Sequence, residues 1–250
     1  MNKVAVVTGA QGGIGRYLVR EYLDAGYTVV GIDCVGDDDT KQERFYFFNI
    51  DLAEVVLDEQ ERISFQAKFE GIVGSRSPRV TLINNAALQV VKPVEQLLVE
   101  DMTRTFAVNA IGPTIMFQIL LPRLRASRGA VLNICSIHTR LTKPDFSIYA
   151  ASKSALESMT RSWAIEYAKD GVAINALSPA ALNTPMLRDG FSENENSLLQ
   201  LNEHHPAGFI GNPEKLAALA RKITEFEDGF LAGSVIDYSG AISSRLHDPQ

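Results

Sequence analysis

The chain has 250 residues, of which 46% are apolar, 22% charged and 8% aromatic, the composition of an ordinary globular protein. This composition excludes a collagen-like, low-complexity or largely disordered chain. With 24 basic against 30 acidic residues the net charge is -6, which argues against the basic surface that nucleic acid or anionic lipid requires.

The cysteines and the apolar segments disfavour further classes of protein. Cys34 and Cys135 are too few for a secreted disulfide framework and form no CxxC zinc or redox motif. The apolar run near the N-terminus ends at Thr8, which is too short for a signal peptide. The most apolar long window, residues 107–124, contains two prolines, so we expect a buried pair of helices rather than a membrane span. We therefore expect a cytoplasmic protein with neither nucleic-acid nor membrane partners.

Short apolar runs alternate with helix-length segments along the chain. Strands are predicted over residues 4–7, 28–32, 44–49, 80–83, 130–134, 173–177 and 234–237. Most of these runs lack polar alternation, as parallel strands covered on both faces do. Helices are predicted over residues 13–25, 54–69, 94–107, 113–125, 148–169 and 213–226. This order predicts an α/β fold, a Rossmann-type doubly wound parallel sheet of seven strands with helices on both faces. Since no linker or repeat divides the chain, we expect a single domain over residues 1–250.

One segment departs from this alternation. Residues 184–212 are polar and irregular, and a stretch of this length inside a compact α/β domain is typical of a lid or a binding loop. Because the segment follows the end of a predicted strand late in the chain, we interpret it as a substrate lid.

The first predicted strand leads directly into the glycine-rich turn Thr8-Gly9-Ala10-Gln11-Gly12-Gly13-Ile14-Gly15, which is followed by a helical pattern. Glycines permit a tight turn and the close approach of a pyrophosphate, and the helix N-terminus offers free N–H donors to the phosphates. A glycine turn alone is common, but its place between a first strand and a first helix favours dinucleotide binding. The turn lacks the Gly-Lys-Ser/Thr ending of a P-loop, which disfavours an NTPase.

Asp33 follows the second predicted strand. A carboxylate there can accept hydrogen bonds from the hydroxyls of an adenosine ribose and would repel a 2′-phosphate. The next basic residue, Lys41, comes only after three further aspartates. The alternative is a solvated acid at a strand end, but together with the glycine turn this pattern favours NAD over NADP.

Tyr149 and Lys153 lie four residues apart in a predicted helix, so both side chains share one face. A phenol has an unperturbed pKa near 10, and a nearby ammonium or the positive end of a helix would stabilise its anion. Ser136 follows a predicted strand, where open α/β sheets form their ligand crevice. Taken alone, a Tyr/Lys pair at this spacing is more often part of an amphipathic helix surface. A serine at the end of a strand is likewise usually a turn residue. No Gly-x-Ser-x-Gly elbow surrounds Ser136, so a hydrolase nucleophile is not supported.

These residues together give a sequence that closely resembles the short-chain dehydrogenase/reductase family along essentially its whole length. The matching motifs are the turn from Thr8 to Gly15, Asn84-Asn85-Ala86-Ala87, Asp51-Leu52, Asn109, Ser136, Tyr149 with Lys153, and Pro179 with Thr184. There are departures: Ala87 and Ala180 replace family glycines, and Ser239-Gly240 stands where Gly-Gly is common. Each adds one small group near the backbone, so we expect shifted cofactor packing rather than lost binding.

The resemblance implies hydride transfer between a nicotinamide and a secondary alcohol or ketone. It assigns Tyr149 as general acid/base, Lys153 as the group that lowers the tyrosine's pKa and holds the nicotinamide ribose, Ser136 as a hydrogen-bond partner of the substrate oxygen, and Asn109 as the holder of a relay water. It implies NAD-binding residues at Gly9, Gln11, Gly12, Gly13, Ile14, Gly15, Asp33, Asp51, Leu52, Asn85, Ala86, Ala87, Tyr149, Lys153, Pro179 and Thr184.

Two other functions stay open. One is an NADPH-dependent carbonyl or 3-oxoacyl reductase, against which Asp33 argues. The other is a non-catalytic dinucleotide-sensing or scaffold protein on the same fold, for which a complete proton path would be superfluous. Family members commonly associate through helices such as residues 113–125 and 148–169, whose apolar surface exceeds what one sheet face needs, so we expect a homodimer or homotetramer.

A few residues have less specific signals. Arg140 or Arg188 could meet an anionic or polyhydroxyl substrate, but an exposed charged loop is the favoured explanation of both residues. His204 and His205 could line a pocket, but they have no third partner at metal-ligand spacing, so no metal is predicted. Cys135 is expected to pack as a small apolar residue.

Overall fold

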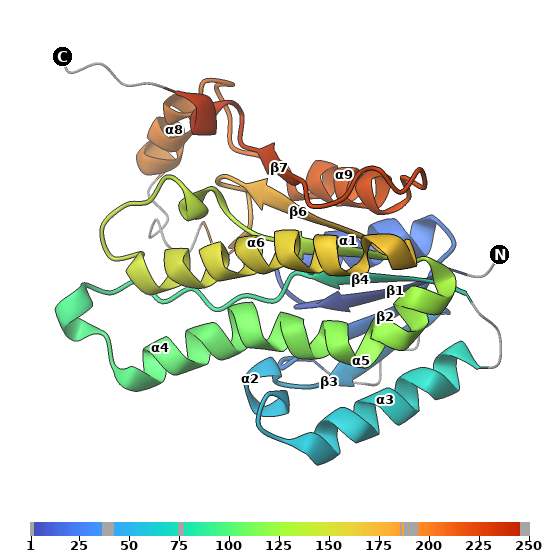
Figure 1. Cartoon of the computed structure of the whole chain (residues 1–250). Helices are drawn as coiled ribbons and strands as arrows, with labels where there is room; N and C mark the ends of the chain where they lie inside the picture. Colours follow the sequence, from blue (N-terminus) through green and yellow to red (C-terminus); the bar gives the residue numbers. More distant parts are fainter. Residues whose placement is uncertain (1–2, 37–42, 75–77, 186, 188–194, 246–250) are drawn as a thin grey trace.

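We describe the protein from a computed structural model over residues 3–36, 43–74, 78–185, 187 and 195–245 (Figure 1). Seven parallel strands form one sheet in the order β3-β2-β1-β4-β5-β6-β7. They are β1 Lys3–Thr8, β2 Thr28–Asp33, β3 Phe45–Asn49, β4 Arg79–Asn84, β5 Ala130–Ile134, β6 Ala173–Pro179 and β7 Val235–Tyr238. The seven predicted strands and the Rossmann-type sheet are confirmed.

Helices cover both faces of the sheet because successive strand residues point to opposite sides. Val4 and Val6 of β1 pack in one core with α3 (Glu59–Val73), α5 (Gly112–Ser127) and α6 (Ser147–Tyr167). Ala5 and Val7 pack in the other core with α1 (Gly15–Asp24) and α9 (Pro213–Thr224). In Figure 1, α5 and α6 run side by side across the near face of the sheet. The sheet is therefore doubly wound, as the apolar runs indicated.

The expected pair of separate helices over residues 94–107 and 113–125 is wrong in one respect. After a short 3-10 turn (Val94–Gln96), α4 (Val99–Phe106) continues through a π-helical turn (Ala107–Ile111) directly into α5. Pro113 has no amide hydrogen, and the wider π turn accommodates this loss without ending the helix. Where the sequence predicts a break before the proline, the structure has a π-helical turn inside one continuous helix.

This continuous run, Val99–Ser127, is long and apolar enough to cross a membrane by length and composition alone. A core helix passes the same test, and the inner face of α5 packs into the core with Met116, Phe117, Leu120 and Leu124. Its apolar character is therefore accounted for on that face by contact with the sheet and α6.

The segment predicted to be irregular, residues 184–212, contains a ten-residue helix, α8 (Glu195–His204). Its two ends lie together: Leu182 and Gly211 form a parallel bridge, and the amide of Asn183 donates to the carbonyl of Gly211 at 2.9 Å. The segment is therefore closed at its base like a flap, while residues 186 and 188–194, including Arg188, lie outside the described residues.

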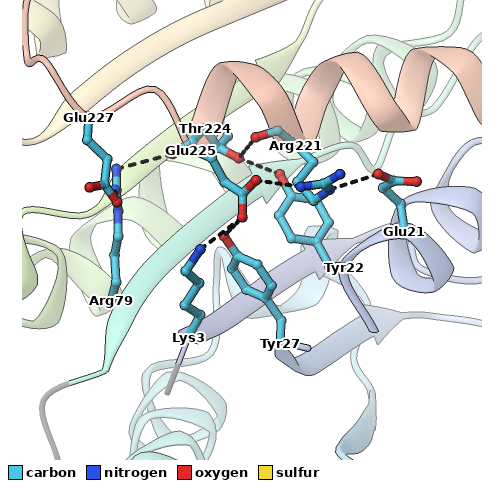
Figure 2. A network of polar contacts seen from close by, with 9 residues as sticks. All are labelled: Lys3, Glu21, Tyr22, Tyr27, Arg79, Arg221, Thr224, Glu225 and Glu227. Atoms are coloured by element: carbon cyan, nitrogen blue, oxygen red, sulfur yellow. Dashed lines mark hydrogen bonds and ion pairs between the residues drawn. The ribbon is translucent and has the colours of Figure 1, made fainter. Parts of the chain in front are cut away.

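A network of ion pairs and hydrogen bonds fastens α9 at the amino end of the sheet (Figure 2). Glu225, just after α9, accepts hydrogen bonds from Lys3 at 2.9 Å and from Tyr27 at 3.0 Å. Arg221 of α9 pairs with Glu21 of α1 at 2.8 Å. Because Lys3 opens β1, this network lies at the opposite edge from the carboxyl ends of the strands. Its role is to hold α9 and α1 against the sheet.

Candidate active site

The order of the strands reverses between β1 and β4, and their following loops meet at this switch point. The hydroxyl of Thr8 accepts hydrogen bonds from the amides of Asn85 at 3.0 Å and Ala86 at 3.1 Å. The side-chain amide of Asn85 donates to the carbonyls of Thr8 and Gly9, each at 3.0 Å. These hydrogen bonds hold the two loops together at the place where open α/β sheets bind ligands.

The glycine turn fits a dinucleotide because side chains would obstruct it. A Cβ on Gly15 would lie 1.8 Å from the carbonyl oxygen of Gly9, and one on Gly9, whose φ is +66°, would lie 2.7 Å from Ala86 Cα. Helix α1 begins without a side-chain cap on Ile14 and without an acidic residue in its first turn. The amides of Arg16 and Tyr17 already donate to the carbonyls of Gly12 and Ile14, at 3.2 and 3.1 Å. In the described part of the chain the amides of Gly13, Ile14 and Gly15, just before them, have no such partner and are the ones available to a phosphate. The turn and the helix N-terminus together suit a pyrophosphate.

Asp33 is held at the end of β2, facing the same turn. One of its carboxylate oxygens accepts a hydrogen bond from the amide of Gln11 at 2.8 Å, and the other accepts one from Val35 at 3.3 Å. Gln11 thereby links the glycine turn to the strand end where the sequence predicts the adenosine ribose. The carboxylate keeps further lone pairs for ribose hydroxyls.

The Asp51-Leu52 pair, predicted to lie beside the adenine, has two different environments. Asp51 caps the short helix α2 (Leu52–Val55) by accepting from the amide of Ala53 at 2.8 Å, and it forms an ion pair with Arg104 of α4. Leu52 is buried, and a Cβ on Gly112 would lie 3.2 Å from its Cβ. Asp51 is therefore the member of this pair that faces the rim, whereas Leu52 packs in the core.

The candidate catalytic residues converge at the carboxyl edge of β5. Burial raises the pKa of Tyr149 to about 12, while a hydrogen bond with Ser136 acts to lower it. Burial lowers the pKa of Lys153 to about 8, and its ammonium donates to the carbonyl of Ile134 at 2.7 Å. The sequence predicted a tyrosine pKa lowered by the lysine. In the structure burial of the phenol dominates, because the ammonium is directed to the strand carbonyl.

Asn109 lies fully buried in the π-helical turn. Its oxygen accepts from the amide of Leu88 at 2.7 Å, while its nitrogen donates to the carbonyl of Leu88 and to the hydroxyl of Ser152, both at 2.9 Å. Ser152 in turn donates to the carbonyl of Tyr149 at 2.7 Å. Both amide hydrogens of Asn109 are thus engaged, and the side chain ties the loop after β4 to the helix that carries Tyr149 and Lys153.

The segment after β6 returns to the glycine turn. Pro179 ends β6, and Thr184 is buried where a Cβ on Gly13 would come within 2.9 Å of its Cβ. Ala180, one of the departures from the family pattern, donates its amide to the carbonyl of Tyr238 at 3.0 Å. The structure therefore places Thr184 next to the glycine turn. The sequence predicts Thr184 as a residue beside the nicotinamide.

Several residues that support the site were missed by the sequence reasoning. A buried polar chain runs from Asn84 to Asn133 at 2.8 Å and on to Thr160 of α6 at 2.9 Å, joining β4, β5 and the catalytic helix. Ser152 is equally buried and links Asn109 to α6. Their signal was available: Asn133 is an amide inside an otherwise apolar strand, and Ser152 lies three residues after Tyr149.

The less specific candidates are placed as follows. Arg140 forms an ion pair with Asp237 of β7, so its charge is already matched. His204 is exposed at the end of α8, whereas His205 is 3% exposed, with Nδ1 bonded to the carbonyl of Leu201 at 2.8 Å. Cys135 packs in the core, and burial raises its thiol pKa to about 12, which confirms the expected apolar role. Among the described residues no group of three or more His, Cys, Asp or Glu side chains could hold a metal ion.

The sheet, the glycine turn at its switch point and the residues around Tyr149 are those of a Rossmann-type dinucleotide-binding oxidoreductase. A model of the short chain dehydrogenase family matches residues 3–195, and the chain belongs to this family, whose members act on small molecules. It is 27% identical over 246 residues to 3beta-hydroxysteroid dehydrogenase 1 of Eggerthella lenta, covering 96% of this chain and 94% of that protein.

Solved structures agree with this assignment. Aldohexose dehydrogenase of Thermoplasma acidophilum superposes with a TM-score of 0.87 at 25% identity, covering 100% of this chain and 98% of the other. A 4-hydroxyisoleucine dehydrogenase complexed with NADH gives a TM-score of 0.86 at 24% identity, covering 98% of this chain and 100% of the other. ElxO with NADP bound gives 0.87 at 23% identity, with the same coverages. The fold therefore occurs with either nicotinamide coenzyme.

Proposed function

We propose that the protein is an NAD(H)-dependent oxidoreductase that transfers a hydride between the nicotinamide and a secondary alcohol or ketone. The observation that carries this proposal is the half-buried Tyr149, whose phenol is hydrogen bonded to Ser136, one helical turn from the fully buried Lys153. These groups lie at the carboxyl edge of the sheet, on the same side as the glycine turn and the N-terminus of α1, which has no side-chain cap. A purely structural role would not favour burying the Lys153 ammonium next to a second titratable group whose pKa is also shifted.

Each residue has a distinct part in the proposed reaction. The coenzyme, when bound, would supply or accept the hydride. Ser136 and Tyr149 hold the substrate oxygen between their hydroxyls, and Tyr149 takes its proton during oxidation or returns it during reduction. Lys153, whose pKa burial brings down to about 8, holds the nicotinamide ribose and can pass a proton near neutral pH. Asn109 positions the helix that carries Tyr149 and Lys153, through its hydrogen bonds to Leu88 and Ser152. The second lone pair of the Asn109 oxygen would accept a hydrogen bond from the relay water.

The preference for NAD is proposed from Asp33. Its carboxylate is fixed by the amide of Gln11 at the predicted ribose end, and like charges at close range repel by several kcal/mol when partly shielded from water. The described residues place no arginine or lysine in hydrogen-bond contact with Asp33. An NADPH-dependent carbonyl or 3-oxoacyl reductase is the second candidate, favoured by the fact that relatives such as ElxO bind NADP.

The proposed substrate class is supported by the relatives, whose names denote hydroxyl-bearing compounds: a 3beta-hydroxysteroid, an aldohexose and 4-hydroxyisoleucine. The flap of residues 184–212, closed at its base by the Leu182–Gly211 bridge, is proposed as the substrate lid of a single catalytic domain. A homodimer or homotetramer that associates through α5 and α6 is also proposed. Ile111, just before α5, is 43% exposed and Ile165, on α6, is 81% exposed, and association would cover these apolar side chains. The proposed location is the cytoplasm, without nucleic-acid or membrane partners.

The test is a panel of secondary alcohols and their ketones, incubated with NAD(H) or NADP(H) and followed at the nicotinamide absorbance. The proposal expects turnover of at least one pair with NAD(H) favoured over NADP(H). Turnover with NADP(H) favoured would establish the reductase alternative. Tight binding of either coenzyme without turnover of any compound would favour the non-catalytic sensor instead.

A further inference from the structure

The C-terminal segment, residues 239–245, lies between α8 and the turn that follows Ser136, and the proposed reaction gives it no part. After β7 the chain bends through Gly240 and Ala241, whose φ angles are +55° and +65°, into a short 3-10 turn, Ile242–Ser244. A left-handed backbone at a residue other than glycine is costly and persists only where surrounding contacts hold it. The bend at Ala241 is therefore held in place by the neighbours of this segment.

One ion pair and two hydrogen bonds join the segment to the serine turn, residues 136–140. One carboxylate oxygen of Asp237 in β7 pairs with Arg140, at the end of the serine turn. The other accepts a hydrogen bond from the hydroxyl of Ser243 at 2.9 Å. Because Ser243 spends its hydrogen there, it accepts one from the hydroxyl of Ser239 at 2.8 Å. Ser239 stands where the family commonly has glycine, so this chain has a link that the family pattern lacks.

The end of the flap rests on the other side of the C-terminal segment. The carbonyl of His204, the last residue of α8, accepts from Arg245 at 3.0 Å, and the amide of Ala207 donates to the carbonyl of Gly240 at 3.2 Å. A Cβ on Gly240 would lie 3.1 Å from that of Ala207 and 3.9 Å from that of the buried His205. In Figure 1 the segment, drawn in red beyond β7, lies against α8. The C-terminal segment is thus the seat of α8.

We propose that Asp237 is a positioning residue: by joining Arg140 to Ser243 it holds the C-terminal segment, and α8 seated on it, beside the serine turn, and so determines the affinity for substrate. The inference rests on the proposed function, which has the substrate bind between the serine turn and the flap. The coenzyme's adenosine and pyrophosphate are expected at β1 and β2, whereas β7 is the far edge of the sheet. Coenzyme affinity should therefore not depend on Asp237.

Four variants separate this role from a general loss of stability. Asp237→Ala removes both partners of the carboxylate, whereas Ser243→Ala removes the two hydroxyl links and leaves the pair with Arg140. Asp237→Asn keeps the shape, since its oxygen can accept from Arg140 and its nitrogen can donate to Ser243. Glu227→Gln is the matched control, because it removes a carboxylate that pairs with Arg79 at the amino end of the sheet. Both ion pairs are partly exposed, so all four variants should fold.

Steady-state kinetics with the substrate found in the alcohol panel give the first test. Asp237→Ala and Ser243→Ala should raise KM about fivefold, the effect of one lost hydrogen bond, with kcat and coenzyme affinity unchanged. Asp237→Asn should stay within about twofold of the wild type, and Glu227→Gln should leave KM as it is. An unchanged KM in Asp237→Ala, or an equal rise in Glu227→Gln, overturns the proposal and leaves the dehydrogenase intact.

Hydrogen exchange tests the seating of α8 without turnover. The amides of α8 and of Ala207 should exchange about fivefold faster in Asp237→Ala, because the flap then opens at a lower free energy. Those of α9 should exchange as in the wild type. Equal exchange of α8 in Asp237→Ala and the wild type overturns the proposal, whether or not a substrate is found. Absence of turnover with every compound and both coenzymes, with α8 exchanging faster, counts against the proposed function and supports the seating.

Discussion

Replacement of Asn109 by alanine should destabilise the protein and disable the candidate site at once. Its side chain makes three hydrogen bonds of 2.7 to 2.9 Å from a fully buried position, two of them to the backbone of Leu88. Asn109→Ala leaves the amide and carbonyl of Leu88 and the hydroxyl of Ser152 without this partner. At about 1 kcal/mol for each group, the loss is about 3 kcal/mol of unfolding free energy. For a chain of this size that corresponds to a fall of about 10 °C in Tm.

The assay can use the single tryptophan, Trp163, which stacks on Phe117 at 4.8 Å and so reports the packing of α6 on α5. Urea unfolding followed by its fluorescence gives the free energy of each variant. Asn109→Asp is the matched control: it keeps the acceptor for the Leu88 amide and loses both donors. Because only the protonated carboxyl can donate, its deficit should shrink as the pH falls. A change below about 1 kcal/mol in Asn109→Ala would refute the positioning role.

Three further predictions concern the coenzyme site and the amino end of the sheet. Asp33→Ser removes the carboxylate expected to repel a 2′-phosphate, so the NADP/NAD ratio of kcat/KM should rise about tenfold, and an unchanged ratio would contradict the assignment. Gly15→Ala places a Cβ 1.8 Å from the Gly9 carbonyl and should abolish coenzyme binding measured by nicotinamide fluorescence, whereas Gly71→Ala, which meets nothing within 4 Å, should bind normally. Burial raises the pKa of Glu225, but hydrogen bonds from Lys3 and its other partners outweigh burial and leave it lowered. Its contribution is therefore present above the unfolded value of about pH 4.3 and lost as the pH falls through the lower folded value. Glu225→Gln should cost about 1 kcal/mol at pH 7 in urea titrations and nothing at the acid end, and a constant difference would speak against this reading.

The fold could be predicted from sequence because its signals are local and repeated. Buried parallel strands need apolar residues on both faces, and runs such as residues 4–7 show this directly. The π-helical turn before Pro113 could not be anticipated, since a proline in a helical pattern ordinarily marks an end. There the continuous packing of α4 and α5 against the rest of the fold overrides the local preference. Helix α8 was missed because its ten residues include only three apolar ones, Leu198, Leu199 and Leu201, which are too few to establish a helical period.

The site was predictable where spacing carries the chemistry, and not where burial decides it. The i, i+4 relation of Tyr149 and Lys153 follows from the sequence, and so does the position of the glycine turn after β1. The direction of the tyrosine's pKa does not, because it depends on how deeply the phenol lies and where the ammonium points. The partners of Asn109 also required the structure, since Leu88 and Ser152 lie 21 and 43 residues away along the chain.

The central claim, that the phenol of Tyr149 moves the substrate proton, is tested most directly by Tyr149→Phe. The variant lacks only the hydroxyl, so its coenzyme affinity, measured by nicotinamide fluorescence, should stay close to that of the wild type. Turnover of the substrate found in the alcohol panel should fall about 10²–10⁴-fold. Wild-type turnover in Tyr149→Phe, with coenzyme bound, would contradict the account.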